Sequence, residues 1–280
     1  MNYRHAYHAG NFADVVKHAV LALAIERLKA KAKPFWALDT HAGVGRYALD
    51  DPRAEKTGEW REGLGRLMAA GNPPAALLPY RQVVAGLNPQ GAPLAHAPGS
   101  PWLIRRLLRR GDRLAACELH AEDAALLKAL FAGDRQVKIH ALDGYWAIKS
   151  FLPPTIRRGL VLVDPPFERA DEFAALAEAL AEGHRRWATG IFLAWYPIKD
   201  PQAVVPFHRA LAASGFGRAL AAEVMLRRPQ DPERLNGCGL VLINPSYELD
   251  QDLETVLPWL AKLLAQGPGA GHRLEWLAKE

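Results

Sequence analysis

The segment Asp164-Pro165-Pro166-Phe167 carries the most informative set of chemical groups in the sequence. It follows an apolar run, 159–163, whose length and composition predict a short buried strand. Proline fixes φ and cannot donate to a sheet ladder, so two prolines end that strand in a rigid loop. The loop offers a carboxylate, freed backbone carbonyls and an aromatic face, which suit an exocyclic amine on a flat ring. A strand followed by a plain proline turn is the alternative interpretation.

A second group of candidates follows the apolar run 34–38 and consists of Asp39-Thr40-His41-Ala42-Gly43-Val44-Gly45. Glycines after a strand let the backbone approach a ligand closely. The loop lacks the third glycine of a dinucleotide fingerprint and the Gly-Lys-Ser/Thr of a phosphate-binding loop, which argues against NAD and ATP. S-adenosylmethionine remains, because its methionine and ribose ends need no phosphate cradle. His41 could instead cap local backbone groups.

Two further acids are placed at predicted strand ends. Glu118 follows the run 113–117, and Asp143, with Gly144 next to it, follows the run 137–142. Glu118 is the candidate for the ribose hydroxyls, and Asp143 for an adenine amino group with Gly144 giving the ring room. Asp143 could equally cap the next helix, and both roles are compatible.

An insertion interrupts the predicted nucleotide-binding pattern. The distance from the glycine loop to Glu118 exceeds the usual spacing of about 20 residues by roughly 50. We therefore expect a core of residues 1–49 plus 98–280 and an inserted helical subdomain at 50–97, with helical patterns near 59–70 and 74–87. The fold class is α/β: a Rossmann-like sheet with helices on both faces.

The first eleven residues are aromatic, basic and aperiodic, which favours a strap over the site rather than a frayed tail. We expect this strap to contribute little to the core. A helix is predicted over 13–30, with Lys17 and His18 near its start, where a helix can face a cleft. Ser100 is expected in a turn before the helix 102–110. Later expectations are helices at 120–132, 171–186, 204–214 and 252–264, and strands at 190–197 (ended by Pro197), 219–226, 239–243 and 274–277.

Composition narrows the class of protein. The chain has 280 residues, half of them hydrophobic, and a net charge of +5. Five arginine pairs suit a polyanion, although a solvated surface would look the same: 105–106, 109–110, 157–158, 185–186 and 227–228. The two cysteines indicate neither a metal site nor a disulfide framework, and no signal peptide or membrane span is apparent. We expect a cytoplasmic protein.

The order of these features resembles the class I S-adenosylmethionine-dependent methyltransferases, and Asp-Pro-Pro-Phe resembles the signature of their amino-methylating branch. Further motifs, spread over essentially the whole chain, look like the RlmJ family of 23S ribosomal RNA adenine-N6 methyltransferases. Those motifs are Tyr3-Arg4-His5, His8-Ala9-Gly10-Asn11, Ala13-Asp14-Val15, Lys17-His18, Asp39-Thr40-His41-Ala42-Gly43, Pro98-Gly99-Ser100-Pro101 and Trp195-Tyr196-Pro197. One departure is Phe167, where many relatives have tyrosine.

The resemblance implies a set of site residues. S-adenosylmethionine, whose product is S-adenosylhomocysteine, would contact His18, His41, Ser100, Glu118, Asp143, Gly144 and Asp164, with no metal. Asp164 would be catalytic, Tyr3 would meet the RNA, and Pro165 and Phe167 would meet the adenine. The partner would be 23S ribosomal RNA, free or in an assembly intermediate, bound by a monomer whose paired arginines hold phosphates. Three alternatives stay open: DNA adenine-N6 methylation, methylation of a protein glutamine amide, and a non-catalytic RNA-binding module.

Overall fold

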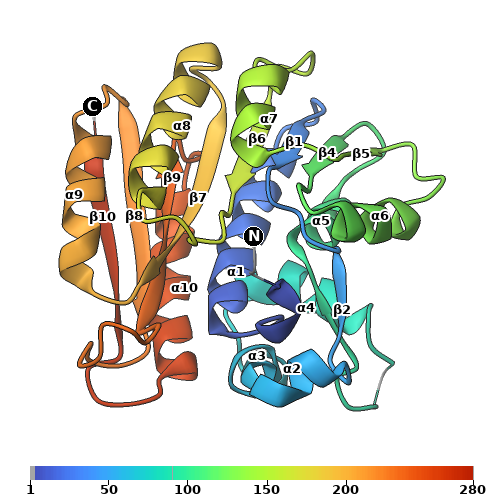
Figure 1. The fold of residues 1–280 in the computed structure, drawn as a ribbon, viewed down its shortest axis with the longest axis vertical. Helices are drawn as coiled ribbons and strands as arrows, with labels where there is room; N and C mark the ends of the chain where they lie inside the picture. The colour runs from blue at the N-terminus through green and yellow to red at the C-terminus, as the bar shows by residue number, and fades with distance from the viewer. Residues whose placement is uncertain (1–3, 90, 280) are drawn as a thin grey trace.

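The chain folds around one large sheet, which a computed structural model describes for residues 4–89 and 91–279 (Figure 1). This sheet has eight strands in the order β10-β8-β9-β7-β6-β1-β4-β5, and β2 and β3 form a separate pair. The strands are β1 (Trp36–Asp39), β2 (Arg46–Ala48), β3 (His96–Pro98), β4 (Arg113–Cys117), β5 (Val137–His140), β6 (Gly159–Val163), β7 (Ile191–Ile198), β8 (Arg218–Met225), β9 (Gly237–Ile243) and β10 (Gly271–Lys279).

The sheet changes character along its width. Strands β5, β4, β1, β6 and β7 are parallel, whereas β9, β8 and β10 continue the sheet in antiparallel pairing. The carboxyl ends of β1, β4 and β6 therefore meet at one edge, where open α/β sheets bind ligands. The residues predicted for chemistry follow those strand ends.

Helices cover both faces of the sheet, which confirms the predicted α/β architecture. Helices α1, α4, α5 and α10 pack into one core cluster and α7, α8 and α9 into the other. The helices are α1 (Phe12–Lys29), α2 (Pro52–Thr57), α3 (Arg66–Ala69), α4 (Leu78–Ala85), α5 (Ser100–Leu107), α6 (Ala121–Leu130), α7 (Gly144–Phe151), α8 (Glu172–Arg186), α9 (Pro201–Ala212) and α10 (Leu249–Leu264). Short turns are η1 (His5–Tyr7), the π-helical η2 (Arg61–Gly65) and η3 (Ala75–Leu77). No helix among the described residues is long and apolar enough to cross a membrane.

Helix α1 is buried on all sides rather than along one stripe. Every residue from Phe12 to Ile25 is buried, because the sheet, α5, α10 and η2 surround the helix. The Asn11 side chain caps its start by accepting a hydrogen bond from the Asp14 amide at 3.0 Å. Polar side chains in this helix consequently lie inside the protein and need partners there.

Several sequence predictions need correction. Pro197 does not end β7: it pairs with Cys238 of β9, and β7 continues to Ile198. Proline is tolerated there because β6 pairs with β7 only as far as Ala194. The strand expected at 274–277 extends over all of β10, and Ser100 is the first residue of α5 instead of preceding it.

The segment 50–97 contains more elements than its pattern indicated. Helix α2 was not predicted, nor was the strand pair at the two ends of the segment, with β2 just before it and β3 at its close. The pattern at 59–70 becomes η2 followed by α3. Figure 1 shows α2, α3 and α4 gathered at one end of the molecule, beside α1. Leu64, Leu67, Leu77 and Tyr80 of this segment are buried in the same cluster as α1. The division of the chain into a core and an inserted subdomain stays a prediction.

Candidate active site

A cavity of about 910 Å³ opens at the carboxyl ends of the parallel strands. Nine of the predicted site residues line it: His18, His41, Ser100, Glu118, Asp143, Gly144, Asp164, Pro165 and Phe167. The structure therefore brings together residues from six separate parts of the sequence. Tyr3, predicted to meet the acceptor, lies outside the described residues.

A chain of ionic contacts connects the strap to the carboxylate after β6. Lys17 Nζ donates to Asp164 Oδ2 at 2.6 Å and lies 2.8 Å from Asp14 Oδ1. The other Asp14 oxygen, Oδ2, is 2.9 Å from His5 Nε2 and accepts from the Gly10 amide at 2.8 Å. The sequence placed Lys17 near the cleft but gave no indication of this ion pair.

Burial determines how these charges behave. Burial disfavours the Lys17 ammonium, yet the charges of Asp14 and Asp164 hold the pKa of Lys17 well above its ordinary value. Burial likewise disfavours the Asp14 carboxylate, and the neighbouring His5 and Lys17 hold the pKa of Asp14 well below its ordinary value. A buried lysine between two carboxylates is a fixed positive charge, and breaking such a pair costs about 3–5 kcal/mol.

Glu118 connects the glycine loop to the end of β4. Its Oε2 accepts from the Gly43 amide at 2.8 Å, and its Oε1 accepts from the His120 amide at 2.7 Å. Gly43 has φ of 60° and Gly45 has φ of 81°, a left-handed conformation that glycine adopts without steric cost. The carboxylate thus holds the loop in shape while it also lines the cavity.

His41 and Asp143 approach the same part of the cavity from β1 and β5. The Thr40 hydroxyl donates to the Leu162 carbonyl at 2.9 Å, so its 2.8 Å contact with His41 Nδ1 must be accepted from an Nδ1–H. Burial lowers the pKa of His41, which leaves Nε2 of the neutral ring as an acceptor. Asp143 caps α7 by accepting from the Trp146 amide at 2.9 Å, so the capping interpretation is confirmed.

Two buried groups lack hydrogen-bond partners among the described residues, and the sequence assigned one of them, Asp39, no role of its own. Asp39, at the end of β1, is fully buried; Ser100 and the His41 amide lie near its carboxylate and favour its charged form, but neither completes a hydrogen bond to it. Burial raises the pKa of Asp39 to about 7. His18 Nε2 is likewise without a partner in the part of the chain that the structure describes, and burial lowers the pKa of His18 to about 3. Such groups fit a polar ligand that supplies the missing hydrogen bonds.

The Asp164 loop ends in a strained aromatic residue. Phe167 has φ of 51°, which costs a non-glycine residue roughly 1–2 kcal/mol. Its ring packs edge-on against Phe173, at 4.9 Å between centroids, and against Trp195, at 5.8 Å. This packing holds the ring over the cavity beside the Asp164 carboxylate. Residues 4–89 and 91–279 contain no group of three or more His, Cys, Asp or Glu side chains placed to hold a metal ion.

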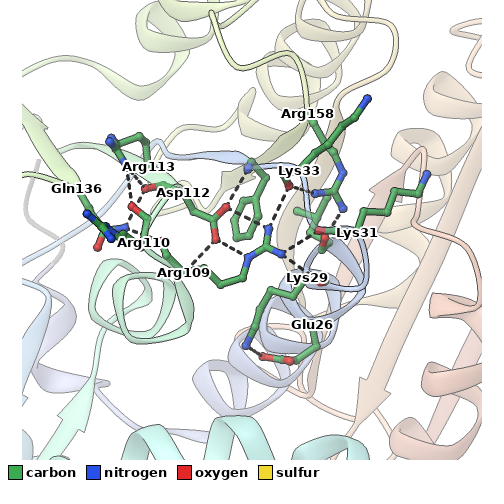
Figure 2. A network of polar contacts seen from close by, with 12 residues as sticks. Glu26, Lys29, Lys31, Lys33, Arg109, Arg110, Asp112, Arg113, Gln136 and Arg158 are labelled. Carbon is green, nitrogen blue, oxygen red and sulfur yellow. Dashed lines mark hydrogen bonds and ion pairs between the residues drawn. The ribbon is translucent and has the colours of Figure 1, made fainter.

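Most of the paired arginines serve the fold rather than the cavity. Arg109 donates to the carbonyls of Lys29, Lys31 and Lys33, and Arg158 to that of Lys33, as Figure 2 shows. Others pair with carboxylates: Arg105 with Asp134, and Arg185 and Arg186 with Glu182. Only Arg227 of the five pairs lines the cavity within the described ranges.

The strap contributes more to the fold than its sequence indicated. Arg4 forms ion pairs with Glu122 and Asp123 of α6, each at 3.2 Å. His8 Nδ1 lies 3.0 Å from Glu59 Oε2, and this contact raises the pKa of His8. The expectation that the strap contributes little to the core is therefore wrong for residues 9–11, which are buried, whereas residues 4–8 are partly exposed and are held by polar contacts.

These features define a class. A Rossmann-like sheet with Gly-x-Gly after β1, an acid after β4 and Asp-Pro-Pro-Phe after β6 is a class I methyltransferase. The family model described as "Ribosomal RNA large subunit methyltransferase D, RlmJ" matches residues 32–278, and the chain belongs to this family.

Known proteins resemble the chain over its whole length. It is 42% identical over 281 residues to ribosomal RNA large subunit methyltransferase J of Escherichia coli (strain K12), with 100% of both chains covered. It is 39% identical over 280 residues to the protein of the same name from Haemophilus influenzae, again covering 100% of both. A crystal structure of a Legionella pneumophila protein matches with a TM-score of 0.88 and 32% identity, over 96% of this chain and 98% of that one.

Proposed function

We propose that this protein transfers a methyl group from S-adenosylmethionine to the N6 amine of an adenine in 23S ribosomal RNA. The observation that carries the proposal is the shared cavity of two half-sites. The glycine loop and its acids lie in one half, and the Asp164-Pro165-Pro166-Phe167 loop with Lys17 lies in the other. The printed names of the relatives, ribosomal RNA large subunit methyltransferases, support the RNA class of acceptor.

The first half-site suits the cofactor. S-adenosylmethionine supplies an electrophilic methyl group on a sulfonium, so the protein mainly has to position the two reactants. The unpartnered carboxylate of Asp39 suits an ammonium group, and Glu118 suits ribose hydroxyls. The neutral His41 Nε2 and the Asp143 carboxylate can accept from an adenine amino group. Four more residues complete the proposed set: His18, Ser100, Gly144 and Asp164.

The second half-site suits the acceptor base. An adenine N6 amine is a poor nucleophile because its lone pair is shared with the ring. Hydrogen bonds from N6–H to Asp164 and to the Pro165 carbonyl favour a more tetrahedral nitrogen, whose lone pair then points at the methyl group. The N–C bond forms as the S–C bond breaks, and the Asp164 carboxylate accepts the surplus N6 proton. Lys17 holds the Asp164 carboxylate in place from behind and supplies a compensating positive charge. Phe167 presents its ring for stacking on the base.

The burial of the Asp164 side chain limits which conformation of the RNA can react. Its side chain is only 15% exposed, so an adenine still stacked in a duplex does not reach it. We infer that the substrate is a single-stranded, bulged or flipped adenine in protein-free RNA or in an assembly intermediate. We also infer that one copy of the chain acts alone, with S-adenosylhomocysteine as the second product and without a metal, in the cytoplasm.

The test is methyl transfer with defined acceptors. Purified protein and S-adenosylmethionine are incubated with a protein-free 23S ribosomal RNA transcript, with DNA of the same sequence and with a glutamine-containing peptide. Mass spectrometry of the digested products is expected to show N6-methyladenosine in the RNA alone. Methylated DNA or peptide together with unmodified RNA would overturn the proposal. Cofactor binding by calorimetry, combined with no transfer to any acceptor, would favour a non-catalytic RNA-binding module.

A further inference from the structure

The cavity has a second, basic end beyond the Asp164 loop. Lys199, Arg227 and Arg234 line it, together with one acid, Glu233. Lys199 follows β7, Arg227 follows β8, and Arg234 belongs to the loop that leads into β9. Ile198 and Met225 both pair with Gly237 in the sheet, so the ends of β7 and β8 flank the start of β9.

One buried residue fixes the three segments that carry these cations. Asn236 donates from its amide to the Ile198 carbonyl at 3.0 Å and accepts from the Leu226 amide at 2.8 Å. Its side-chain Nδ2 donates to the carbonyls of Lys199 and Asp231, each at 2.8 Å. The backbone beneath this end of the cavity is therefore held in one arrangement, which is what a preformed binding site requires.

Arg227 has unused donor capacity there. Its Nη2 donates to Gln266 Oε1, but its Nη1 is buried and has no acceptor in the part of the chain that the structure describes. Burial and the nearby Arg234 charge lower the pKa of Arg227. An anion at this position would offset both the partial burial of the Arg227 charge and its repulsion by Arg234. Arg169, which also lines the cavity, differs because Asp171 already neutralises it, at 2.7 Å.

We propose that Lys199, Arg227 and Arg234 form a subsite for a phosphodiester of the RNA strand that carries the target adenine. This inference rests on the function proposed above and names a part of its substrate site. A planar guanidinium with free N–H groups matches the oxygens of a phosphate. The single acid, Glu233, leaves the end of the cavity with an excess of positive charge.

The position of the subsite indicates which part of the RNA it holds. In the sheet order β8-β9-β7-β6, Arg227 and Asp164 follow strands that are three positions apart, a lateral separation of roughly 14 Å. Successive stacked nucleotides rise by only about 3.4 Å. The subsite therefore lies far enough from Asp164 to contact the backbone of the bound strand rather than the target base. Such a contact positions the strand without reading its sequence.

The experiment compares two neighbouring arginines. Arg227→Gln removes a cation from the cavity, whereas Arg228→Gln removes one from an exposed residue that does not line it. Binding of a single-stranded fragment of the 23S transcript is measured over a series of salt concentrations. Arg227→Gln is expected to weaken binding about tenfold or more and to lower the log–log salt slope by about 0.7. Arg228→Gln is expected to match the wild type, and both variants should keep wild-type affinity for S-adenosylmethionine and wild-type rate at saturating RNA.

Equal losses in the two arginine variants, or an unchanged salt slope for Arg227→Gln, would overturn the subsite. Gln266→Ala removes the side-chain partner of Arg227 but keeps the Arg227 charge. This variant should bind RNA as the wild type does. If Arg227→Gln does not fold, Arg234→Gln, which lies in an exposed loop, tests the subsite instead. It is expected to lower the salt slope, and an unchanged slope would refute the subsite. If the wild-type protein methylates no RNA, the proposed function itself is wrong. If the wild type methylates RNA but the variants bind RNA as it does, only the subsite is wrong.

Discussion

Lys17 Nζ lies 2.6 Å from Asp164 Oδ2, although 147 positions separate the two residues. The contact joins the first turns of α1 to the end of β6, so the helix supplies the counter-charge for the proposed catalytic loop. Asp14 holds Lys17 from the other side at 2.8 Å. The ammonium therefore keeps one carboxylate partner when the other is removed, so a variant at Asp164 loses one buried ion pair without leaving Lys17 unpaired.

Asp164→Ala is expected to abolish methyl transfer. The rate should fall about 10²-fold or more, because the carboxylate that accepts a hydrogen bond from the adenine amine is gone. The variant should stay folded at a measurable cost in stability, since it loses one buried ion pair while Lys17 keeps its contact with Asp14. Asp164→Asn should keep part of the activity, because an amide oxygen still accepts a hydrogen bond. Single-turnover methylation of the RNA transcript, run beside thermal unfolding, measures both effects. Normal turnover by the alanine variant would remove Asp164 from the mechanism.

Glu118→Ala is expected to weaken cofactor binding by about 1.5–3 kcal/mol, because charge-assisted hydrogen bonds of the carboxylate are lost. The structure adds a second cause: the Gly43 and His120 amides lose their acceptors, so the glycine loop loosens. Glu118→Gln should fall between the alanine variant and the wild type, because one amide oxygen still accepts. Calorimetric titration with S-adenosylmethionine gives the affinities, and RNA binding serves as the control. Unchanged cofactor affinity in the alanine variant would place the ribose elsewhere.

Asp39 predicts a pH-dependent penalty on stability. Burial raises its pKa from 3.8 to about 7, so the folded state holds a proton that the unfolded state releases. The free energy of unfolding therefore falls as pH rises from about 4 to about 7, by a few kcal/mol at most. Asp39→Asn removes this slope, and without cofactor it should exceed the wild type in stability by more at pH 8 than at pH 5. Urea unfolding at the two pH values measures the difference; an equal gain at both would show that Asp39 does not titrate in this range.

Two residues of the strap are expected to have different roles, one in stability and one in RNA binding. His5→Ala leaves the buried Asp14 carboxylate short of a partner and is expected to cost about 1–3 kcal/mol of stability. Tyr3→Ala is expected to leave stability nearly unchanged and to lower methylation through RNA engagement, because an aromatic side chain can stack on an unpaired base. Chemical denaturation and RNA titration of both variants distinguish the two roles. A Tyr3→Ala variant that binds RNA at wild-type affinity would leave the strap with a purely structural role.

The edge of the sheet that carries the site was predictable because strand ends are readable in this sequence. Apolar runs stop at Asp39, Glu118, Asp143 and Asp164, and parallel strands bring such ends together. A local pattern sufficed for each, since each acid lies in its strand or within three residues of the strand's end.

The partners of buried charges were not predictable in this way. Lys17 in a helical pattern indicates a solvated position, and only the burial of α1 on all sides makes it an internal cation. The intramolecular partners of the paired arginines were unpredictable for a related reason. The composition does not reveal that Arg109 and Arg158 donate hydrogen bonds to loop carbonyls, because those acceptors lie far away in sequence.

The burial of α1 has a consequence for how the protein is made. Arg27 of α1 donates to both carboxylate oxygens of Asp252 on α10, at 2.6 and 2.7 Å, across 225 positions of sequence. Synthesis proceeds from the amino terminus, and contacts that are distant in sequence form late. The first long helix to leave the ribosome therefore keeps an apolar flank exposed until α10 has been synthesised. An interrupted chain that lacks α10 would display this flank, so synthesis of α10 is a condition for closing the core around α1.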